Sequence, residues 1–455
     1  MRSKNQSVDL GTGSIGKLLF SLALPSIIAQ LINVLYNVVD RMYIGHIPET
    51  GALALTGVGV TMPIILMISA FSSLVCMGGS PRAAIELGKG NKQKAEEIMG
   101  NCFILLVLFG ILLTFIAEVF GEWMLLLFGA SQSTLPYALD YLRIYALGTL
   151  FVQSALGMNM FINTQGYAKY GMATVVIGAV INILLDPIFI FVFGMGVKGA
   201  ACATILSQAV SALFVLWFLR SSKSSLHLQK RYFKLTPAII GPCLMLGLSP
   251  FVMNITESLL SVCFNSSLLR YGGDVAVGAM AILASVMQFS MLPLQGLTQG
   301  SQPLISYNYG AGKYDRIRKT FKILLVSALL YSSAMWALAQ FMPQLLAHMF
   351  TNNAELVEYT CWAIRIYMAM SFCFGAQIAC QQTFIALGNA KTSLFLALLR
   401  KVFLLIPLIY ILPSLFENKV FAVFLAEPVA DTLAVATTCI LFARYYKKVL
   451  LKEPK

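Results

Sequence analysis

Long apolar runs alternate with short polar connections along almost the whole chain. A run of about 20 apolar residues is long enough to cross the hydrocarbon core of a bilayer as a helix. Twelve such runs are present, and several are long enough to tilt or to project beyond the bilayer. We therefore predict an all-α integral membrane protein with twelve transmembrane helices. Their approximate cores are residues 18–40, 53–77, 98–120, 137–162, 170–193, 199–219, 238–269, 275–300, 321–346, 356–386, 393–414 and 420–443.

The composition agrees with this pattern. The 455 residues are 58% hydrophobic and 11% charged, with a mean hydropathy of +0.79, whereas a soluble domain has about 25% charged residues. The nine cysteines show no CxxC pairs and lie mostly in apolar runs, so we interpret them as buried apolar residues rather than as disulfides or metal ligands. No nucleotide-binding loop or histidine cluster is present, so we expect neither an enzyme nor a resident cofactor.

The net charge of +13 could suggest nucleic-acid binding, but its distribution indicates a membrane topology. Of the 32 lysines and arginines, twenty-four lie in one alternating set of connections and termini, and only four lie in the opposite loops. This bias predicts that both termini are cytoplasmic, in a multi-pass protein of the cell membrane. The basic residues are therefore expected to face lipid headgroups, and nucleic acid is not an expected partner.

The two halves of the sequence resemble each other. The basic segment 221–237 separates an N-lobe (residues 1–220, spans 1–6) from a C-lobe (residues 238–455, spans 7–12). Three short motifs recur at one constant offset along the chain, which indicates an internal duplication. Six spans in each half predict parallel repeats, as in some transporters. The motif pairs begin at Pro81 and Pro303, at Arg143 and Arg365, and at Gly166 and Gly388.

The fifth span contains a carboxylate where charge is costly. Asn182 and Asp186 are four residues apart and share a helix face, and Pro187 frees the carbonyl one turn earlier. By helical rise, Asp40 reaches a similar depth in the first span and Thr204 in the sixth. We predict that these four side chains converge. Their oxygens suit a hard cation or a shared proton, and the alternative is a buried, purely structural acid.

The duplication provides an internal comparison for these acids. Asp40 aligns approximately with Asn265, and Asp186 aligns with Leu408. The C-lobe therefore reaches the same architecture with neutral residues at both positions, which argues that packing alone does not require the two carboxylates.

The C-lobe has intramembrane acids of its own. Glu257 lies in the seventh span, and Glu427 and Asp431 lie four residues apart in the twelfth. Arg400 reaches the depth of Asp431, so a buried ion pair between them is an open alternative to a transport role for Asp431. Glu427 and Glu257 have no such obvious partner in the sequence. We therefore expect these two glutamates to face the lobe interior or the cleft, as a C-lobe proton or substrate site.

Several of these motifs together resemble one known family. The segment VDRMYIG at residues 39–45, the Asn182–Pro187 motif and the segment GVKGAA at residues 196–201 are similar to those of the multidrug and toxic compound extrusion (MATE) family. The resemblance covers nearly the whole chain and implies two six-helix lobes. It also implies an antiporter that exchanges amphipathic, often cationic organic compounds for Na⁺ or H⁺, and we expect a monomer.

The resemblance also implies which residues of this chain form the functional sites. The N-lobe cation site of the family would fall on Asp40, Asn182, Asp186 and Thr204, and a C-lobe glutamate of some members would fall on Glu257. A partner acid that some members have in the tenth span is absent here, where the chain has Gln377, Gln381 and Gln382. A C-lobe site of that kind would therefore need Glu427 or Asp431 instead.

Three other function classes fit the sequence less well. A flippase for lipid-linked oligosaccharides could share the fold, but it would favour a cationic cavity, and outside Arg400 and Lys401 the mid-span charges are acidic. A membrane-embedded enzyme is disfavoured because no nucleophile–base pair or metal cluster is evident. A channel fits a two-lobed repeat with acids in each lobe less well than alternating access does.

Overall fold

The structure is a computed structural model that describes residues 9–451. The first eight residues of the proposed N-lobe and the last four of the proposed C-lobe lie outside the described part. The described chain is helical throughout, with short connections. The N-terminal half contains α1 (Ile15–Gly45), α2 (Gly51–Gly88), α3 (Lys92–Leu127), α4 (Leu135–Leu147), α5 (Thr149–Thr164), α6 (Ala168–Pro187), the π-helix η1 (Ile188–Val192) and α7 (Val197–Arg220).

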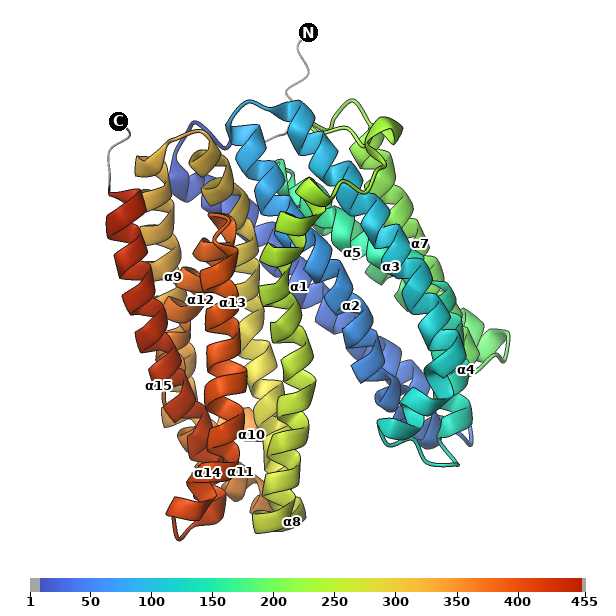
Figure 1. Ribbon diagram of the computed structural model, residues 1–455. Coiled ribbons are helices and arrows are strands. Elements are labelled where there is room, and N and C mark those ends of the chain that lie inside the picture. The colour runs from blue at the N-terminus through green and yellow to red at the C-terminus, as the bar shows by residue number, and fades with distance from the viewer. Residues whose placement is uncertain (1–8, 452–455) are drawn as a thin grey trace.

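The C-terminal half follows a connection that contains the 3₁₀ helix η2 (Lys230–Tyr232). Its elements are α8 (Pro237–Gly310), α9 (Tyr314–Phe341), α10 (Pro343–His348), α11 (Ala354–Tyr367), η3 (Ser371–Cys373), α12 (Phe374–Ala386), α13 (Ala390–Leu398), the π-helix η4 (Leu399–Leu405), α14 (Ile406–Leu415), α15 (Lys419–Tyr445) and the π-helix η5 (Tyr446–Leu450). Figure 1 shows the two halves as separate helical bundles that touch near the end where the chain begins and ends.

Nine helices of the described chain are individually long and apolar enough to cross a membrane, and two bent helix pairs bring the number to eleven. The twelfth span comes from α8, which has 74 residues. At about 1.5 Å per residue it would be far longer than a bilayer of about 30 Å. Gly273 breaks it with a φ of 66° and a ψ of −161°, a backbone conformation suited to glycine. The twelve-helix, all-α prediction is confirmed.

Two predicted spans are bent rather than continuous. The pair α4 and α5, predicted as one span over 137–162, bends by 58°, and the pair α11 and η3–α12, predicted over 356–386, bends by 50°. The breaks lie at Gly148 and around Met370, which are equivalent positions in the two repeats. The sequence pattern missed both bends because apolar residues continue through them.

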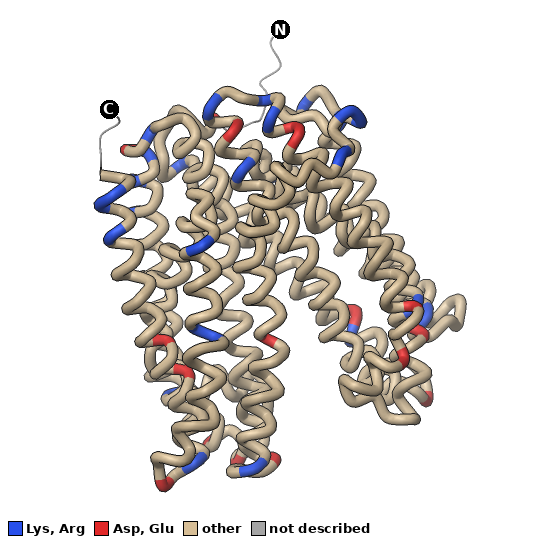
Figure 2. Tube along the Cα trace, viewed as in Figure 1, with Lys and Arg blue, Asp and Glu red and all other residues tan. Residues whose placement is uncertain are grey.

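Lysine and arginine residues gather at the end of the molecule where the described chain begins and ends (Figure 2). The connection between the halves is anchored at that end by the N-lobe. The main-chain N–H of Leu226 donates to Gln165, that of His227 to Glu96 and that of Thr236 to Asn101, at 2.8–3.0 Å. The connection is thus an ordered part of the N-lobe surface rather than a loose tether.

The two lobes are joined at this same end by main-chain contacts between helices. A Cβ built on Gly78 of α2 would lie 1.9 Å from the carbonyl oxygen of Cys243 in α8, and one on Gly300 of α8 would lie 2.4 Å from the Cα of Ala23 in α1. Such distances leave no room for a side chain. A small cluster of buried apolar residues, which includes Leu19 of α1 and Leu304 of α8, completes the seam.

Candidate functional site

The N-lobe acids predicted from the sequence lie together where α1, α6 and α7 meet. Asn182 and Asp186 are fully buried, and Asp40 and Thr204 are nearly so. The side-chain amide of Asn182 donates to Asp186 Oδ1 at 3.2 Å and approaches Thr204 Oγ1 at 3.5 Å. The carboxyl groups of Asp40 and Asp186 lie close enough to influence each other electrostatically. The structure thus brings the four side chains together around one small polar space, the N-lobe cluster.

Several oxygens of the N-lobe cluster lack a partner. Asp40 Oδ1, Asn182 Oδ1 and Asp186 Oδ2 are buried and accept no hydrogen bond within the described chain. An unpaired buried carboxylate is costly, and two of them facing each other cannot easily both stay ionised. The arrangement therefore favours either a proton on one carboxyl group or a small hard cation among the oxygens.

Asp186 lies next to a local irregularity of its helix. Pro187 cannot donate the hydrogen bond of a regular helix, and the chain continues from it into the π-helix η1. Short π-helical segments widen the helix, leave carbonyls less tightly paired and occur often at functional sites. Asp186 lies immediately before this distortion, in the last turn of α6. The helix irregularity and the buried acid are therefore parts of one feature.

Sequence reasoning missed two tyrosines at the N-lobe cluster. Tyr36 precedes Asp40 by one helical turn and interacts electrostatically with Asp40 and Asp186, and the spacing of four residues could have identified it. Tyr141 of α4 is buried, and its hydroxyl lies near the Thr204 side chain. No local sequence pattern indicates Tyr141, because it arrives from a helix that is distant in the sequence.

The C-lobe acids form an ion-pair network that contradicts two expectations. Arg400 Nε donates to Asp431 Oδ1 at 2.7 Å, as the alternative of a buried ion pair proposed. Arg400 also donates to Glu427 Oε1 at 3.1 Å, and Lys401 Nζ donates to Glu257 Oε1 at 2.5 Å. Glu427 and Glu257 therefore both have a basic partner, contrary to the expectation from the sequence that neither had one.

The physical reason is that the acids lie on two different helices, Glu257 on α8 and the other two on α15, and η4 contacts both. Adjacent residues of a helix point about 100° apart, so Arg400 reaches the acids of α15 while Lys401 reaches Glu257. Within η4 both cations reach carboxylates, and Lys401 also donates to the main-chain carbonyl of Met253 at 3.1 Å. Three acids and two cations lie in this network, and Glu427 Oε2 is buried without a partner.

A polar cavity of about 220 Å³ lies between the lobes. It is lined by α1, α2, α5 and α6 of the N-lobe and by the second part of α8, and its polar lining consists of neutral amides and hydroxyls. Asn159 Oδ1 and Asn163 Oδ1 are buried there without a hydrogen-bond partner. A central cleft between the lobes was expected from the sequence, but the amides that line this cavity were not identified. The residues that supply its amides are Gln30, Asn33, Asn159, Asn163, Gln299 and Gln302.

Comparison with known proteins identifies the family. The family model named MatE matches residues 25–188 and again residues 250–411. The chain is 25% identical to the multidrug export protein MepA of Staphylococcus haemolyticus over 93% of each sequence. Among solved structures, it is similar to MATE in the bent conformation, with a TM-score of 0.91, 21% identity, and coverage of 99% of this chain and 100% of that one.

A further structure is more similar in sequence. The MATE multidrug transporter DinF-BH, solved in complex with a bound ligand, is 34% identical with a TM-score of 0.89. The match covers 99% of this chain and 100% of that one. The two family matches cover most of the chain and fall one in each half. This chain therefore belongs to the MATE family of multidrug efflux transporters, as its intramembrane motifs had indicated.

Proposed function

We propose that this protein is a secondary antiporter of the cell membrane that exports amphipathic, often cationic organic compounds in exchange for Na⁺ or H⁺ by alternating access. The observation that carries this proposal is the N-lobe cluster of Asp40, Asn182, Asp186 and Thr204, in which two buried carboxyl groups face each other without a cationic side chain hydrogen-bonded to either. A buried site of this kind binds and releases a proton or cation when its access changes.

Coupling requires that ion and substrate favour different states of one carrier. The seam at the end of the termini is closed by main-chain contacts, while the lobes diverge toward the opposite end (Figure 1). With the termini proposed to be cytoplasmic, this is the outward-open arrangement of a monomeric carrier. Proton or cation binding at the N-lobe cluster would bias the lobes toward one arrangement, and substrate binding toward the other.

The relatives support the class of cargo. MepA is named as a multidrug export protein, and DinF-BH is named as a multidrug transporter. The inter-lobe cavity has neutral amide walls with no lysine or arginine among its described lining residues, which suits an uncharged or cationic organic molecule. An oligosaccharide diphosphate would require cationic side chains there, and Arg400 and Lys401 are engaged with carboxylates.

The C-lobe network is proposed to be a supporting element rather than the principal coupling site. Its two cations neutralise two of the three carboxylates Glu257, Glu427 and Asp431. A proton on the third carboxylate would neutralise the remaining negative charge. Glu257 differs from the other two because its side chain is 66% exposed, so it is the C-lobe acid accessible to substrate.

The proposal is tested in proteoliposomes that contain the purified protein. A fluorescent organic cation such as ethidium is supplied, and either a Na⁺ gradient or a pH gradient is imposed separately. Gradient-driven transport under one condition and not the other identifies the coupling ion. Absence of transport under both gradients, with protein that binds the dye, would refute cation-coupled antiport.

A further inference from the structure

A second cavity lies on the C-lobe, outside the path between the lobes. It is a groove of about 550 Å³ between α9, α12 and α15. The helix α15 lies on the side of the C-lobe that faces away from the N-lobe (Figure 1). No residue of the N-lobe cluster, the C-lobe network or the amide-lined cavity contributes to this groove. The C-lobe groove therefore needs an explanation separate from transport.

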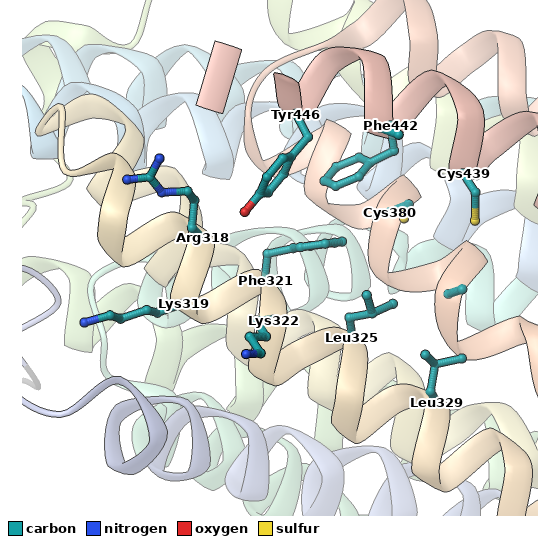
Figure 3. Close-up of a pocket in the computed structure, with 12 residues that line it drawn as sticks. Arg318, Lys319, Phe321, Lys322, Leu325, Leu329, Cys380, Cys439, Phe442 and Tyr446 are labelled. Atoms are coloured by element: carbon teal, nitrogen blue, oxygen red, sulfur yellow. The ribbon is translucent and has the colours of Figure 1, made fainter. Parts of the chain in front are cut away.

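The lining of the C-lobe groove changes from basic to apolar along its length (Figure 3). Arg318, Lys322, Leu325 and Leu329 follow one face of α9 at spacings of four, three and four residues. Eleven residues of helix span about 16 Å, which is about half of a hydrocarbon core of 30 Å. The groove therefore has the length and the polarity order of a single membrane leaflet.

The basic end lies in the first turns of α9, near the end of the molecule that contains the chain termini. Lys319 and Lys322 are exposed there. Arg318 pairs with Asp315 and also donates to the carbonyl of Leu450 at 3.2 Å. Because one carboxylate stands beside three cationic side chains, the basic end has a net positive charge and is complementary to an anion.

Aromatic side chains line the apolar part of the groove. Phe321 and Phe442 stack with their ring centroids 4.4 Å apart, and Tyr446 adds a ring 6.2 Å from Phe321. Cys380 and Cys439 line the side toward the apolar end. A second copy of this chain would need about 800 Å² of contact surface per partner for a stable interface, which far exceeds such a groove, whereas an acyl chain needs only a narrow apolar channel.

We propose that the C-lobe groove binds one anionic phospholipid of the leaflet on the side of the termini. The phosphate and an anionic headgroup would contact Lys319, Lys322 and Arg318, and an acyl chain would lie along Phe321 and Leu325 toward Leu329. A lipid in this position packs against α9 and α15 together and stabilises the outer wall of the C-lobe.

The test compares lipid retention by native mass spectrometry of the full chain, purified in detergent with equal amounts of dioleoyl phosphatidylglycerol and dioleoyl phosphatidylcholine. The wild-type protein should retain one phosphatidylglycerol in preference to phosphatidylcholine. A basic residue near the surface contributes about 1 kcal/mol to binding of anionic lipid, so K319Q/K322Q should lose this preference by about 30-fold.

Two further variants separate the headgroup from the acyl chain. Lys447 and Lys448 are exposed at the same end but do not line the groove, so K447Q/K448Q, with the same loss of charge, should keep the preference. Ala376→Trp fills the apolar wall and keeps every lysine, and should reduce retention of both lipids. Circular dichroism and size-exclusion chromatography check that each variant is folded.

Several outcomes would overturn the proposal. Equal retention of the two lipids by the wild-type protein would show that the basic end does not select an anion. An equal loss of preference in K447Q/K448Q would assign selectivity to the general charge of this end. Protection against thermal unfolding by inorganic phosphate alone, equal to that by phosphatidylglycerol, would assign the basic end to free phosphate. Displacement of the lipid by ethidium would make the groove a substrate site.

Discussion

Gly88 of α2 and Tyr307 of α8 approach so closely that a Cβ at Gly88 would lie 2.0 Å from the Tyr307 carbonyl oxygen. The reciprocal contact is also present, because a Cβ at Gly310 would lie 1.9 Å from the carbonyl oxygen of Ile85. Gly310 is the repeat equivalent of Gly88, and Tyr307 is the equivalent of Ile85 at the same offset. The two contacts are thus related by the internal repeat and lie on opposite sides of one pseudo-twofold axis.

This seam yields the first prediction. Gly88→Ala and Gly310→Ala each force a methyl group into a main-chain carbonyl, which no rotamer change can relieve. Overpacking costs about 1–3 kcal/mol, and we expect a lower thermal midpoint together with slower efflux in proteoliposomes. Gly59→Ala is the matched control in α2, since a Cβ there meets no atom within 4 Å. Wild-type behaviour of both seam variants would show that the lobes do not need this close approach.

The second prediction concerns the N-lobe cluster. Asp186→Asn and Asp40→Asn should each abolish gradient-driven efflux while the protein still inserts and folds, because a neutral amide is less costly to bury than a carboxylate. Efflux of a fluorescent cation and the thermal midpoint are measured on the same preparation. The control is Asp140→Asn, which removes a half-exposed acid paired with Lys198 and should leave efflux intact. Wild-type efflux by either cluster variant would make these carboxyl groups structural.

The third prediction concerns the C-lobe network. Arg400→Gln leaves Asp431 and Glu427 buried without their cation, and removing one partner of a buried pair costs about 3–5 kcal/mol. We expect a large drop in thermal midpoint and in the folded yield. The triple variant R400Q/E427Q/D431N should recover most of that loss, because no charge then remains unpaired. If R400Q is as stable as the wild type, the ion pairs do not contribute to C-lobe stability.

The fourth prediction concerns the stability of a Glu257 variant. The Glu257 side chain is 66% exposed, but that of Lys401 is only 5% exposed, so Glu257→Gln leaves a buried ammonium with the Met253 carbonyl as its remaining acceptor. Glu257→Gln should therefore lower the unfolding temperature, but by less than Arg400→Gln, which removes the cation of two buried carboxylates. A loss of stability equal to that of Arg400→Gln would show that the Lys401–Glu257 pair is as essential as the buried pairs.

The fifth prediction addresses the segment before α1, which is fastened to the C-lobe. The Arg316 guanidinium donates to the carbonyls of Leu10, Thr12 and Gly13 at 3.0–3.3 Å. The Asp9 carboxylate holds this turn by accepting from the Thr12 hydroxyl at 2.7 Å and from the Gly11 N–H at 2.9 Å. Those hydrogen bonds hold the pKa of Asp9 below its usual value of 3.8.

A lowered folded-state pKa means that the turn is stabilised above the unfolded pKa and loses this contribution as the pH falls through the folded value. In Asp9→Asn, the Gly11 amide should therefore exchange faster with deuterium than in the wild type at pH 6. The difference should vanish well below pH 3.8. The same exchange rate in both proteins at pH 6 would show that the Asp9 carboxylate does not hold the turn.

The sequence predicted much of the architecture because membrane insertion imposes simple rules. Apolar length identified the spans, and the constant offset between motifs identified the repeat that relates Gly88 to Gly310. The N-lobe acids were identified because a carboxylate within an apolar span is costly to bury and therefore indicates a functional site. Tyr141 was missed because its partner Thr204 is distant in the sequence, and no periodic pattern reports a contact of that kind.

The ion pairs of Glu427 with Arg400 and of Glu257 with Lys401 were missed for a different reason. Helical rise matched the depth of Arg400 to that of Asp431, but depth does not show which neighbouring helices the adjacent residues Arg400 and Lys401 face. The bends within the fourth and tenth spans were missed because local departures from ideal helix geometry leave little trace in hydropathy.

The seam between α2 and α8 also bears on how such a carrier can change its cargo. Its contacts at Gly88 and Gly310 join main chain to main chain, so they depend on backbone shape and not on the side chains elsewhere on either lobe. If the lobes move as proposed, residues that line the amide-lined cavity can be replaced without disturbing this contact. The contact between the lobes and the preference for cargo would then depend on different residues.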